Sequence, residues 1–330
     1  MPSLETTLAR AWLRRGPLAC ALWPVSLLFA GLSKARAALY ARGLMHSERL
    51  PVPVVVVGNI FIGGTGKTPL TIWLVEQLRA AGFNPGVISR GFGSSSDAPR
   101  AVTANSKPQD VGDEPVLIAQ RARCPLVVGR QRIQAGKALL ALHPEVDVII
   151  SDDGLQHYAL ERDVEIVLFD SRGVGNGWLL PAGPLREPAS RPRDFTVYNA
   201  AQAPPGAWRM QLVGGFAERG EERLPLAALA GKRLVAAAGI GNPARFFNTL
   251  RSAGLDFAEL PLPDHHDFLD RPFDGIDADI ILVTEKDAVK CAQIENLRND
   301  PRIWVVPVSA QLDGALAEHI VEKCRGRSLA

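Results

Sequence analysis

The chain has 330 residues, of which 47% are apolar and 22% are charged, and its formal net charge is +2. This composition is ordinary for a soluble α/β protein, and the length favours two domains. Residues 1–50 hold seven Lys and Arg against two Glu. The basic excess is therefore local, which argues against a general nucleic-acid binder.

The first element is an uncharged stretch, residues 16–33, with basic residues on both sides. A secretory signal, a membrane-spanning helix, a core-packing helix pair and an interfacial helix would all fit this pattern. Pro17 and Pro24 disturb a straight spanning helix. We therefore predict that residues 1–45 form a basic, apolar helical segment that contacts a membrane.

A phosphate-binding loop follows at residues 58–70, GNIFIGGTGKTPL. The β-branched run before it predicts a buried parallel strand, and the apolar spacing after it predicts a helix that ends near Gly82. Backbone N–H groups of such a loop surround anionic oxygens, Lys67 can reach the β- and γ-phosphates of a nucleotide, and Thr68 suits a Mg²⁺ ligand. The predicted nucleotide-binding residues are Gly63, Gly64, Thr65, Gly66, Lys67 and Thr68.

One residue departs from the usual G-x-x-x-x-G-K-[ST] pattern. Position 61, where the pattern has glycine, is Phe61. We expect Gly58 and the Gly63–Gly64 pair to supply the missing backbone freedom. Export of the protein would conflict with a nucleotide site that follows the N-terminal segment so closely, because ATP is cytosolic.

Strands are predicted near 53–58, 86–89, 126–128, 146–151 and 164–169. They indicate an α/β fold of the P-loop NTPase type, with a mostly parallel sheet, helices on both faces and a second, smaller α/β domain. Asp152 and Asp153 follow the strand at 146–151, at the sheet edge where ligands bind. Asp152 is the candidate carboxylate for Mg²⁺.

Two further clusters carry candidate chemistry. Asp113, in GDEP, is either a helix cap or a general base that takes a proton from an acceptor hydroxyl. Asp264, His265, His266 and Asp267 form a cluster for which a catalytic histidine and a metal fragment are both open. Arg90, Arg132 and Arg186 lie in turn-like segments after predicted strands, as expected for a site that handles several phosphates.

Other patterns exclude alternatives. TEKD, residues 284–287, has the wrong order for a guanine-reading N-K-x-D, so a GTPase is disfavoured. GIGNP, residues 239–243, is a lone glycine turn that we do not interpret as a second nucleotide site. Cysteines are present at positions without metal-like spacing, and we predict free thiols for all of them: Cys20, Cys124, Cys291 and Cys324.

Taken together, these motifs resemble the lipid A 4′-kinase (tetraacyldisaccharide 4′-kinase) family of Gram-negative bacteria. The resemblance spans residues 54–290, and the matching stretches are VVVVGNIFIGGTGKTP, VISRGFG, VGDEP, VVGRQR, SDDGLQH, LPAGPLREP, PDHHDF and TEKDAVK. It implies transfer of the ATP γ-phosphate to the 4′-hydroxyl of an acylated glucosamine disaccharide 1-phosphate, with Mg²⁺. It also implies a peripheral enzyme at the cytoplasmic face of the inner membrane.

The resemblance also implies roles for single residues. Asp113 matches the base and His265 its partner, Lys67 and Thr68 match the nucleotide loop, and Asp152 matches the metal-associated carboxylate. Other matching positions lie near the phosphates or the substrate: Arg90, Glu114, Arg132, Asp153, Gln156, His157 and Arg186. The chain departs from the family at Phe61, usually Thr or Ser, and at Leu155, often aromatic.

The expected organisation has four parts: a membrane-contact segment (1–45), a nucleotide-binding domain (46–200), a linker (201–228) and a second α/β domain (229–330). We expect the active site in the cleft between the two domains, with Asp113 and His265 meeting as the cleft closes. The expected partners are a lipid substrate in the bilayer and the membrane surface, with no nucleic acid and no protein partner implied. Two alternatives stay open: a membrane-associated P-loop ATPase switch, and a P-loop kinase of a small soluble acceptor.

Overall fold

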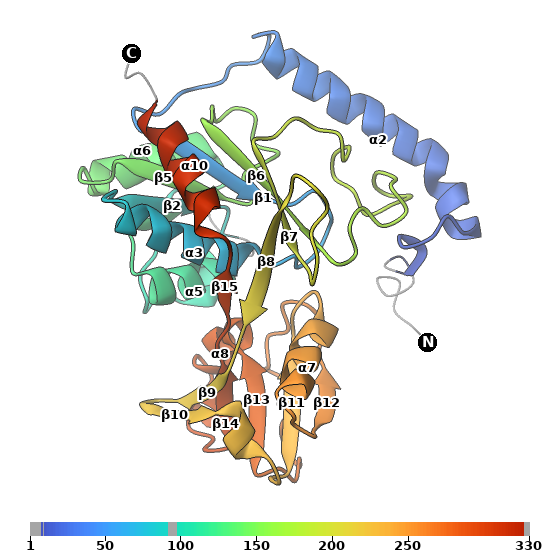
Figure 1. The fold of residues 1–330 in the computed structure, drawn as a ribbon, viewed down its shortest axis with the longest axis vertical. Coiled ribbons are helices and arrows are strands. Elements are labelled where there is room, and N and C mark those ends of the chain that lie inside the picture. The colour runs from blue at the N-terminus through green and yellow to red at the C-terminus, as the bar shows by residue number, and fades with distance from the viewer. Residues whose placement is uncertain (1–7, 9, 92–97, 327–330) are drawn as a thin grey trace.

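The computed structural model describes residues 8, 10–91 and 98–326. Within these residues the chain forms two sheets, one above the other in Figure 1, and a long N-terminal helix that lies along the outside of the larger part. The predicted segment 1–45 and the VISRGFG motif, residues 87–93, therefore lie partly outside the described residues.

The larger sheet has nine strands in the order β15-β8-β7-β6-β1-β5-β2-β4-β3, among the described residues. The strands from β8 to β4 are parallel to their neighbours, and the edge strands β15 and β3 pair antiparallel. Their bounds are β1 (Val54–Gly58), β2 (Pro85–Ser89), β3 (Arg100–Ala101), β4 (Leu126–Val128), β5 (Val148–Asp152), β6 (Val164–Asp170), β7 (Phe195–Asn199), β8 (Trp208–Val213) and β15 (Ser309–Gln311).

Helices cover both faces of this sheet because the side chains of β1 alternate between two apolar cores. Val55 and Val57 face a core shared with α3 (Lys67–Ala80), α5 (Asp113–Ala122) and α10 (Gly314–Arg325). Val54 and Val56 face the opposite core, which includes α6 (Arg132–Leu142). A strand that is apolar at every position is typical of a parallel sheet buried on both faces, as the sequence predicts.

The smaller sheet has six strands in the order β10-β9-β14-β13-β11-β12 among the described residues. It is parallel from β14 to β12 and antiparallel at β9 and β10. Its elements are β9 (Phe216–Arg219), β10 (Glu222–Pro225), β11 (Leu234–Ala238), β12 (Ala258–Pro261), β13 (Ile280–Thr284), β14 (Ile303–Val306), α7 (Pro243–Ser252), α8 (Glu285–Cys291), α9 (Glu295–Arg298) and a 3₁₀ turn (Leu226–Leu229). The remaining short helix, α4 (Pro108–Val111), precedes α5 in the larger part.

The sheets do not divide the chain at the boundaries expected from the sequence. Residues 208–213, expected in a linker, form β8 of the larger sheet, and 216–225 form a hairpin of the smaller one. Residues 309–325, expected in the second domain, return to the larger part as β15 and α10. Residues 214–308 are therefore inserted between two strands of the larger sheet, and Figure 1 shows β8 and β15 leading into the lower part.

The N-terminal helix α2 runs from Pro17 to Ala41. Pro17 occupies its first turn, where a missing N–H costs nothing, and the helix continues past Pro24. Within the described residues it is the one helix long and apolar enough to cross a membrane. Ser26 is buried and donates to the Leu179 carbonyl, whereas most of the apolar side chains of α2 are exposed.

Within the described residues the four cysteines are present as thiols, and three of them, Cys124, Cys291 and Cys324, are buried.

Candidate active site

The phosphate loop connects β1 to α3. The positive φ angles of the loop fall on Gly63 (+98°) and Gly66 (+102°), so these two glycines supply the required backbone freedom. The expectation is therefore correct for Gly63 and wrong for Gly58 and Gly64, which have no positive φ. Asn59 fixes the loop from inside, because its Nδ2 donates to the carbonyls of Phe61 (2.6 Å) and Gly63 (3.0 Å). Its Oδ1 accepts from Lys67 Nζ at 3.2 Å, which aims the lysine along the loop.

Phe61 is a packing residue of this loop. It is buried, bridges to Leu185 and carries the guanidinium of Arg172 at 4.3 Å from its ring centroid. Arg172 is itself held by Asp170 (Nη2–Oδ2 2.6 Å) and reaches the carbonyl of Gly64 at 3.5 Å. The departure from the usual glycine therefore adds an aromatic platform under the loop.

The remaining predicted loop residues begin α3. Gly64 and buried Thr65 precede Gly66, the N-cap, and Thr68 is the second residue of the helix. The carbonyl of Thr65 accepts from Asn199 Nδ2 at 2.9 Å and from Arg245 Nη1 at 3.3 Å. The larger sheet and the inserted part thus both hold the same peptide group.

The predicted carboxylates lie beside the loop at the end of β5, which pairs with β1. Asp152 is buried and accepts from the hydroxyls of Thr71 (3.2 Å) and Ser89 (3.4 Å). Burial and the negative charges of Glu114 and Asp153 raise the pKa of Asp152 to about 7, against the opposing effect of Lys67 and Arg132. Because its partners are neutral hydroxyls and its pKa is raised, a nearby cation would stabilise the ionised form of Asp152.

Asp153 turns away from the strand, with φ +49°. It lies 3.2 Å from Arg186 Nη1 and 3.8 Å from Lys67 Nζ. Although burial alone would raise the pKa of Asp153, Lys67 and Arg186 hold it below its ordinary value. Asp153 is therefore charged at neutral pH and connects the loop lysine to a predicted arginine.

The other predicted basic groups lie around this edge. Arg132 begins α6, is buried, and donates to the carbonyls of Gly129 (2.8 Å) and Asp152 (3.4 Å). Burial lowers the pKa of Arg132 to about 10. Burial and the charges of Arg132 and Arg90 lower the pKa of His157 to about 4, so its imidazole is neutral at pH 7. Arg90 follows β2 and is exposed.

Gln156 belongs to a supporting network rather than to the phosphate edge. Its Nε2 donates to Glu187 Oε1 at 2.8 Å, and the other oxygen of Glu187 accepts from Tyr158 at 2.8 Å. Glu187, buried and paired with Arg191, was not singled out from the sequence. Its position directly after Arg186 in LREP was the available signal.

Asp113 and His265 lie in contact across the two parts of the molecule, with Asp113 Oδ2 3.1 Å from His265 Nδ1. Asp113 is the first residue of α5, and its Oδ1 accepts the N–H of Glu114 at 2.9 Å. His265 follows β12 of the smaller sheet and has φ +60°, a conformation rare outside glycine. The sequence predicts this pair, and the structure brings it together.

Two lysines of α8, which sequence reasoning missed, surround this pair. Lys286 Nζ lies 3.2 Å from Glu114 Oε1, 4.0 Å from Asp113 Oδ2 and 3.3 Å from His265 Nε2. Lys290 Nζ lies 3.9 Å from Asp113 Oδ2. Burial alone would raise the pKa of Asp113, but the hydrogen bond to His265 and the charges of the lysines hold it below its ordinary value. The signal was TEKDAVK, a charged helix start directly after a buried strand.

A pocket joins the phosphate loop to the smaller sheet. One wall is the loop with Lys67 and Thr68, and the other comes from the start of α7 and from Lys286. Gly241, in the glycine turn 239–243, approaches so closely that an added Cβ would lie 2.7 Å from the Gly64 nitrogen. The turn that we did not assign to a nucleotide therefore forms a wall of the phosphate loop. Arg245, also missed, lies in the first turn of α7, directly after this glycine turn.

Within the described residues, no group of three or more His, Cys, Asp and Glu side chains could hold a metal ion alone. A hydroxyl and a single carboxylate, Thr68 and Asp152, are nevertheless the oxygen donors that suit Mg²⁺ when phosphate oxygens complete its shell. His266 takes no part in such a site, because its Nε2 lies 3.2 Å from Asp270 and its Nδ1 accepts the N–H of Phe268.

Comparisons with known proteins identify the family. A model of the tetraacyldisaccharide-1-P 4′-kinase (LpxK) family matches residues 18–325. The tetraacyldisaccharide 4′-kinase of Janthinobacterium sp. (strain Marseille) is 65% identical, covering 99% of this chain and 98% of that protein. That of Herminiimonas arsenicoxydans is 59% identical over the same shares.

A solved structure, LpxK from Aquifex aeolicus in complex with ATP, superposes with a TM-score of 0.76. It is 28% identical, and the match covers 93% of this chain and 99% of that one. The predicted fold class and the resemblance drawn from the motifs are confirmed. The chain belongs to the tetraacyldisaccharide-1-P 4′-kinase family.

Proposed function

We propose that the protein transfers the γ-phosphate of ATP to the 4′-hydroxyl of a tetraacylated glucosamine disaccharide 1-phosphate. The observation that carries this proposal is the Asp113–His265 contact at 3.1 Å, which joins the two parts of the chain. Their neighbours Glu114 and Lys286 line the pocket together with the phosphate loop. The names of the relatives supply the substrate class.

The loop residues bind the nucleotide in this proposal. Gly63, Gly64, Thr65 and Gly66 present backbone N–H groups to the phosphates, and Lys67 neutralises their charge. The pocket beside the loop has apolar side chains, Leu212, Phe246 and Val306 among them, that suit an adenine ring. Thr68 and Asp152 would hold Mg²⁺, which supplies charge neutralisation at the phosphates.

Asp113 accepts the proton of the attacking hydroxyl. The O–H bond of the acceptor breaks, its oxygen bonds to the γ-phosphorus, and the bond from that phosphorus to the β–γ bridging oxygen breaks to release ADP. His265 orients the carboxylate, and Arg90, Arg132 and Arg186 provide a basic edge for phosphate oxygens, beside the neutral imidazole of His157. Glu114, Asp153 and Gln156 hold neighbouring side chains through Lys286, Arg186 and Glu187 respectively.

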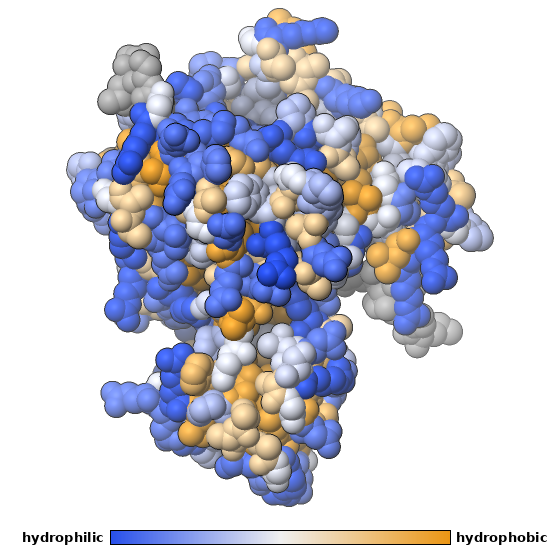
Figure 2. All heavy atoms as spheres, viewed as in Figure 1, coloured by the Kyte–Doolittle hydropathy of each residue, from blue (hydrophilic) through white to orange (hydrophobic). Residues whose placement is uncertain are grey.

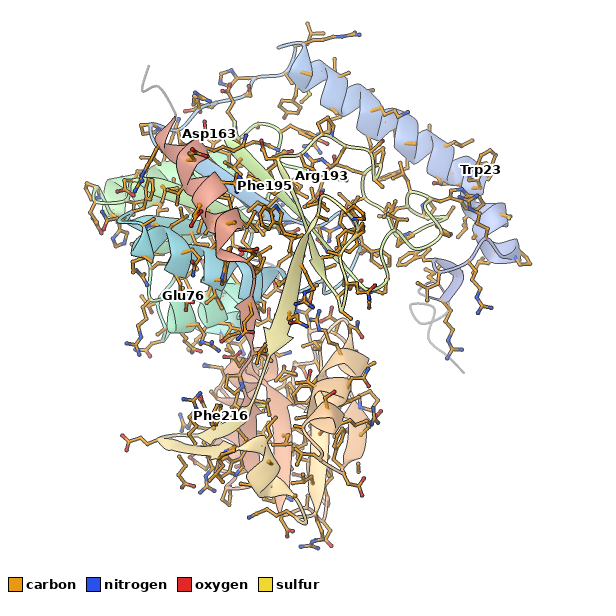
Figure 3. All side chains as sticks on the ribbon, in the orientation of Figure 1. Trp23, Glu76, Asp163, Arg193, Phe195 and Phe216 are labelled. Carbon is orange, nitrogen blue, oxygen red and sulfur yellow. The ribbon has the colours of Figure 1, made fainter. Side chains whose placement is uncertain are left out.

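We also propose that α2 brings the enzyme to its lipid substrate as a peripheral contact at the cytoplasmic face of the inner membrane. The helix exposes Leu18, Trp23, Val25, Leu27, Leu28, Leu32 and Leu39. In Figure 2 apolar residues, drawn in orange, are visible along α2. In Figure 3 Trp23 lies near the N-terminal end of this helix. Apolar side chains with basic neighbours suit the interface of an anionic bilayer.

The test is transfer of γ-³²P from Mg·ATP to tetraacyldisaccharide 1-phosphate in detergent micelles. We expect label on the lipid with the wild type and with Asp110→Ala, an exposed carboxylate three residues from the site. We expect loss of at least about a hundredfold in Lys67→Ala and Asp113→Ala.

Other results would separate the alternatives. Transfer that persists in Asp113→Ala would leave this residue as a helix contact only. ATP hydrolysis without any labelled lipid would favour an ATPase switch, and turnover of a water-soluble acceptor would favour a different kinase.

A further inference from the structure

The imidazole of His265 lies between a carboxylate and an ammonium group. On one side its Nδ1 is 3.1 Å from Asp113 Oδ2, and on the other its Nε2 is 3.3 Å from Lys286 Nζ. The backbone holds the residue in place, because the His265 N–H donates to the Gly239 carbonyl at 3.2 Å and to Asp264 Oδ1 at 3.0 Å. The ring therefore has a defined partner at each nitrogen.

Neighbouring carboxylates keep Lys286 in its protonated, charged form. Its Nζ lies within 3.5 Å of carboxylate oxygens of Glu114 and Asp264. Burial alone would lower the pKa of Lys286, but Glu114, Asp113 and Asp264 together raise it above its ordinary value. The side chain is an ammonium at any pH at which the enzyme works.

An ammonium group donates hydrogen bonds and cannot accept them. The nitrogen that faces it must therefore offer a lone pair, which leaves the single proton of a neutral imidazole on Nδ1. That proton points at Asp113 Oδ2. Two separate contacts thus select the same one of the two possible tautomers.

We propose that Lys286 is a positioning residue that holds the neutral imidazole of His265 in the Nδ1–H tautomer. His265 then donates a hydrogen bond to Asp113 and is not a relay for the acceptor's proton. The proton from the acceptor hydroxyl stays on the Asp113 carboxyl and leaves to solvent after ADP is released. This inference rests on the proposed function only where it assigns Asp113 as the base.

The charged groups around His265 decide how it responds to pH. Asp113 faces it from α5, Asp264 from its own loop and Lys286 from α8, while Glu114 and Lys290 act through Lys286 and Asp113. The hydrogen bond to Asp113 raises the pKa of His265 above its ordinary value, although burial and the charge of Lys286 oppose this effect. Removing Lys286 should therefore favour the imidazolium.

Lys290 offers a matched control on the same helix. It also carries charge toward Asp113, at 3.9 Å from Oδ2, and it pairs with Asp287 at 3.4 Å. Its described contacts are with these carboxylates and with the ring of Phe268, not with the imidazole. Lys290→Met removes a nearby positive charge and leaves the Lys286–His265 contact in place.

The experiment is two-bond ¹H–¹⁵N correlation of the imidazole rings in the full-length protein labelled at histidine. The chain has six histidines, and His265→Gln identifies the relevant signal. We expect the Nδ1–H tautomer in the wild type, in Lys290→Met and in Lys286→Arg, which keeps a charged donor. In Lys286→Met we expect loss of the single tautomer and a rise of about one unit in the pKa of His265.

Kinetics supply a second readout. The acid limb of the kcat profile should move to higher pH by about the same amount in Lys286→Met, while the KM for ATP stays constant. An Nε2–H tautomer in the wild type, or an unchanged tautomer in folded Lys286→Met, would overturn the proposal. So would a raised KM for ATP with an unchanged tautomer, which would make Lys286 a phosphate ligand. The spectra decide the tautomer even if the protein phosphorylates no lipid, so failure of the proposed function is recognised separately.

Discussion

Asp113 uses its two carboxylate oxygens for different contacts. Oδ1 accepts the N–H of Glu114 at the start of α5, and Oδ2 faces His265. The N-cap of α5 is Gly112 and no side chain caps this helix, so the helix-cap interpretation of Asp113 is wrong, and its role as a general base is our proposal. Since neighbouring positive charges keep Asp113 ionised, its value as a base in our proposal comes from its position rather than from a raised pKa.

We expect the phosphate loop to tolerate a side chain poorly at Gly66, the glycine just before α3. Gly66→Ala would place a Cβ 2.6 Å from Asn199 Nδ2 at a φ of +102°. We expect ATP affinity to fall by at least about tenfold, because the loop must shift to relieve contact and strain. The measurement is titration of ATP by calorimetry.

Gly82→Ala is the matched control for that change. Its φ of +91° is equally unfavourable, but no atom lies within 4 Å of its added Cβ. A similar loss of ATP affinity in both variants would show that the crowding at Asn199 is irrelevant.

His157 links pH to the stability of the site. Its pKa is lowered to about 4 in the folded chain, whereas the unfolded chain takes up the proton near pH 6.5. The folded state is therefore disfavoured as pH falls from about 6.5 to 4. We expect the wild type to lose about 2 kcal/mol more unfolding free energy over this range than His157→Gln, measured by urea denaturation. Equal losses of unfolding free energy in the wild type and in His157→Gln would contradict a neutral, buried imidazole.

At the scale of elements, the sequence predicts the strands that carry their own signal. β1 and β5 are runs of apolar residues buried on both faces, and their predicted positions agree with the structure to within two residues. β8 (WRMQLV) mixes exposed Arg and Gln with apolar residues, and β15 has three residues. Such strands are defined by the partner with which they pair, and a single sequence does not contain that information.

The same distinction holds for the site. Lys67, Asp152 and Asp113 are predicted because each follows a recognisable strand or turn at the carboxyl edge of the sheet. Lys286 and Arg245 lie far along the chain, and they matter only because α8 and α7 are brought against the phosphate loop. No local pattern specifies that approach.

The exposed apolar side chains of α2 lead to a prediction about membrane binding. Leu28 and Leu32 are 65% and 64% exposed on successive turns. Replacing both by Glu should weaken association with anionic vesicles by at least about tenfold, because apolar area is lost and negative charge is added. The measurement is co-sedimentation with the vesicles.

Leu142→Glu provides the comparison for the α2 variant. Leu142 is 58% exposed but ends α6, away from α2 in sequence and structure. Equal loss of vesicle binding in both proteins would indicate a general charge effect and not a membrane-contacting helix.

At the scale of the whole molecule, the site depends on how the inserted residues 214–308 sit against the larger sheet. The backbone of Gly241 meets that of Gly64, Arg121 of α5 pairs with Glu285 of α8, and β8 and β15 enter and leave side by side. Phe216, labelled in Figure 3, lies where the chain leaves β8 for the smaller sheet. The placement of the two parts relative to one another therefore sets the geometry of the proposed catalytic groups.

Gly241→Ala tests this dependence. The new Cβ would lie 2.7 Å from the Gly64 nitrogen and 3.1 Å from Asp264, so the two parts must separate slightly. We expect kcat/KM for ATP to fall about tenfold because the catalytic groups of the two parts are misplaced, with little change in melting temperature because the separation relieves the contact. Gly314→Ala, which meets no atom within 4 Å, should behave as the wild type. Unchanged kinetics in Gly241→Ala would mean that the contact is not required.

The insertion between β8 and β15 also affects the order in which a ribosome can complete the protein. Leu316 and Ile320 of α10 belong to the core that covers one face of β1, yet they are translated after the whole inserted part. Although α3 and α5 already pack on that face, synthesis of residues 214–308 at about 5–20 residues per second leaves it without α10 for about 5–20 s. The nascent enzyme therefore presents an unfinished apolar surface to chaperones until its last helix emerges, and its C-terminal residues determine when the first half of the chain is finished.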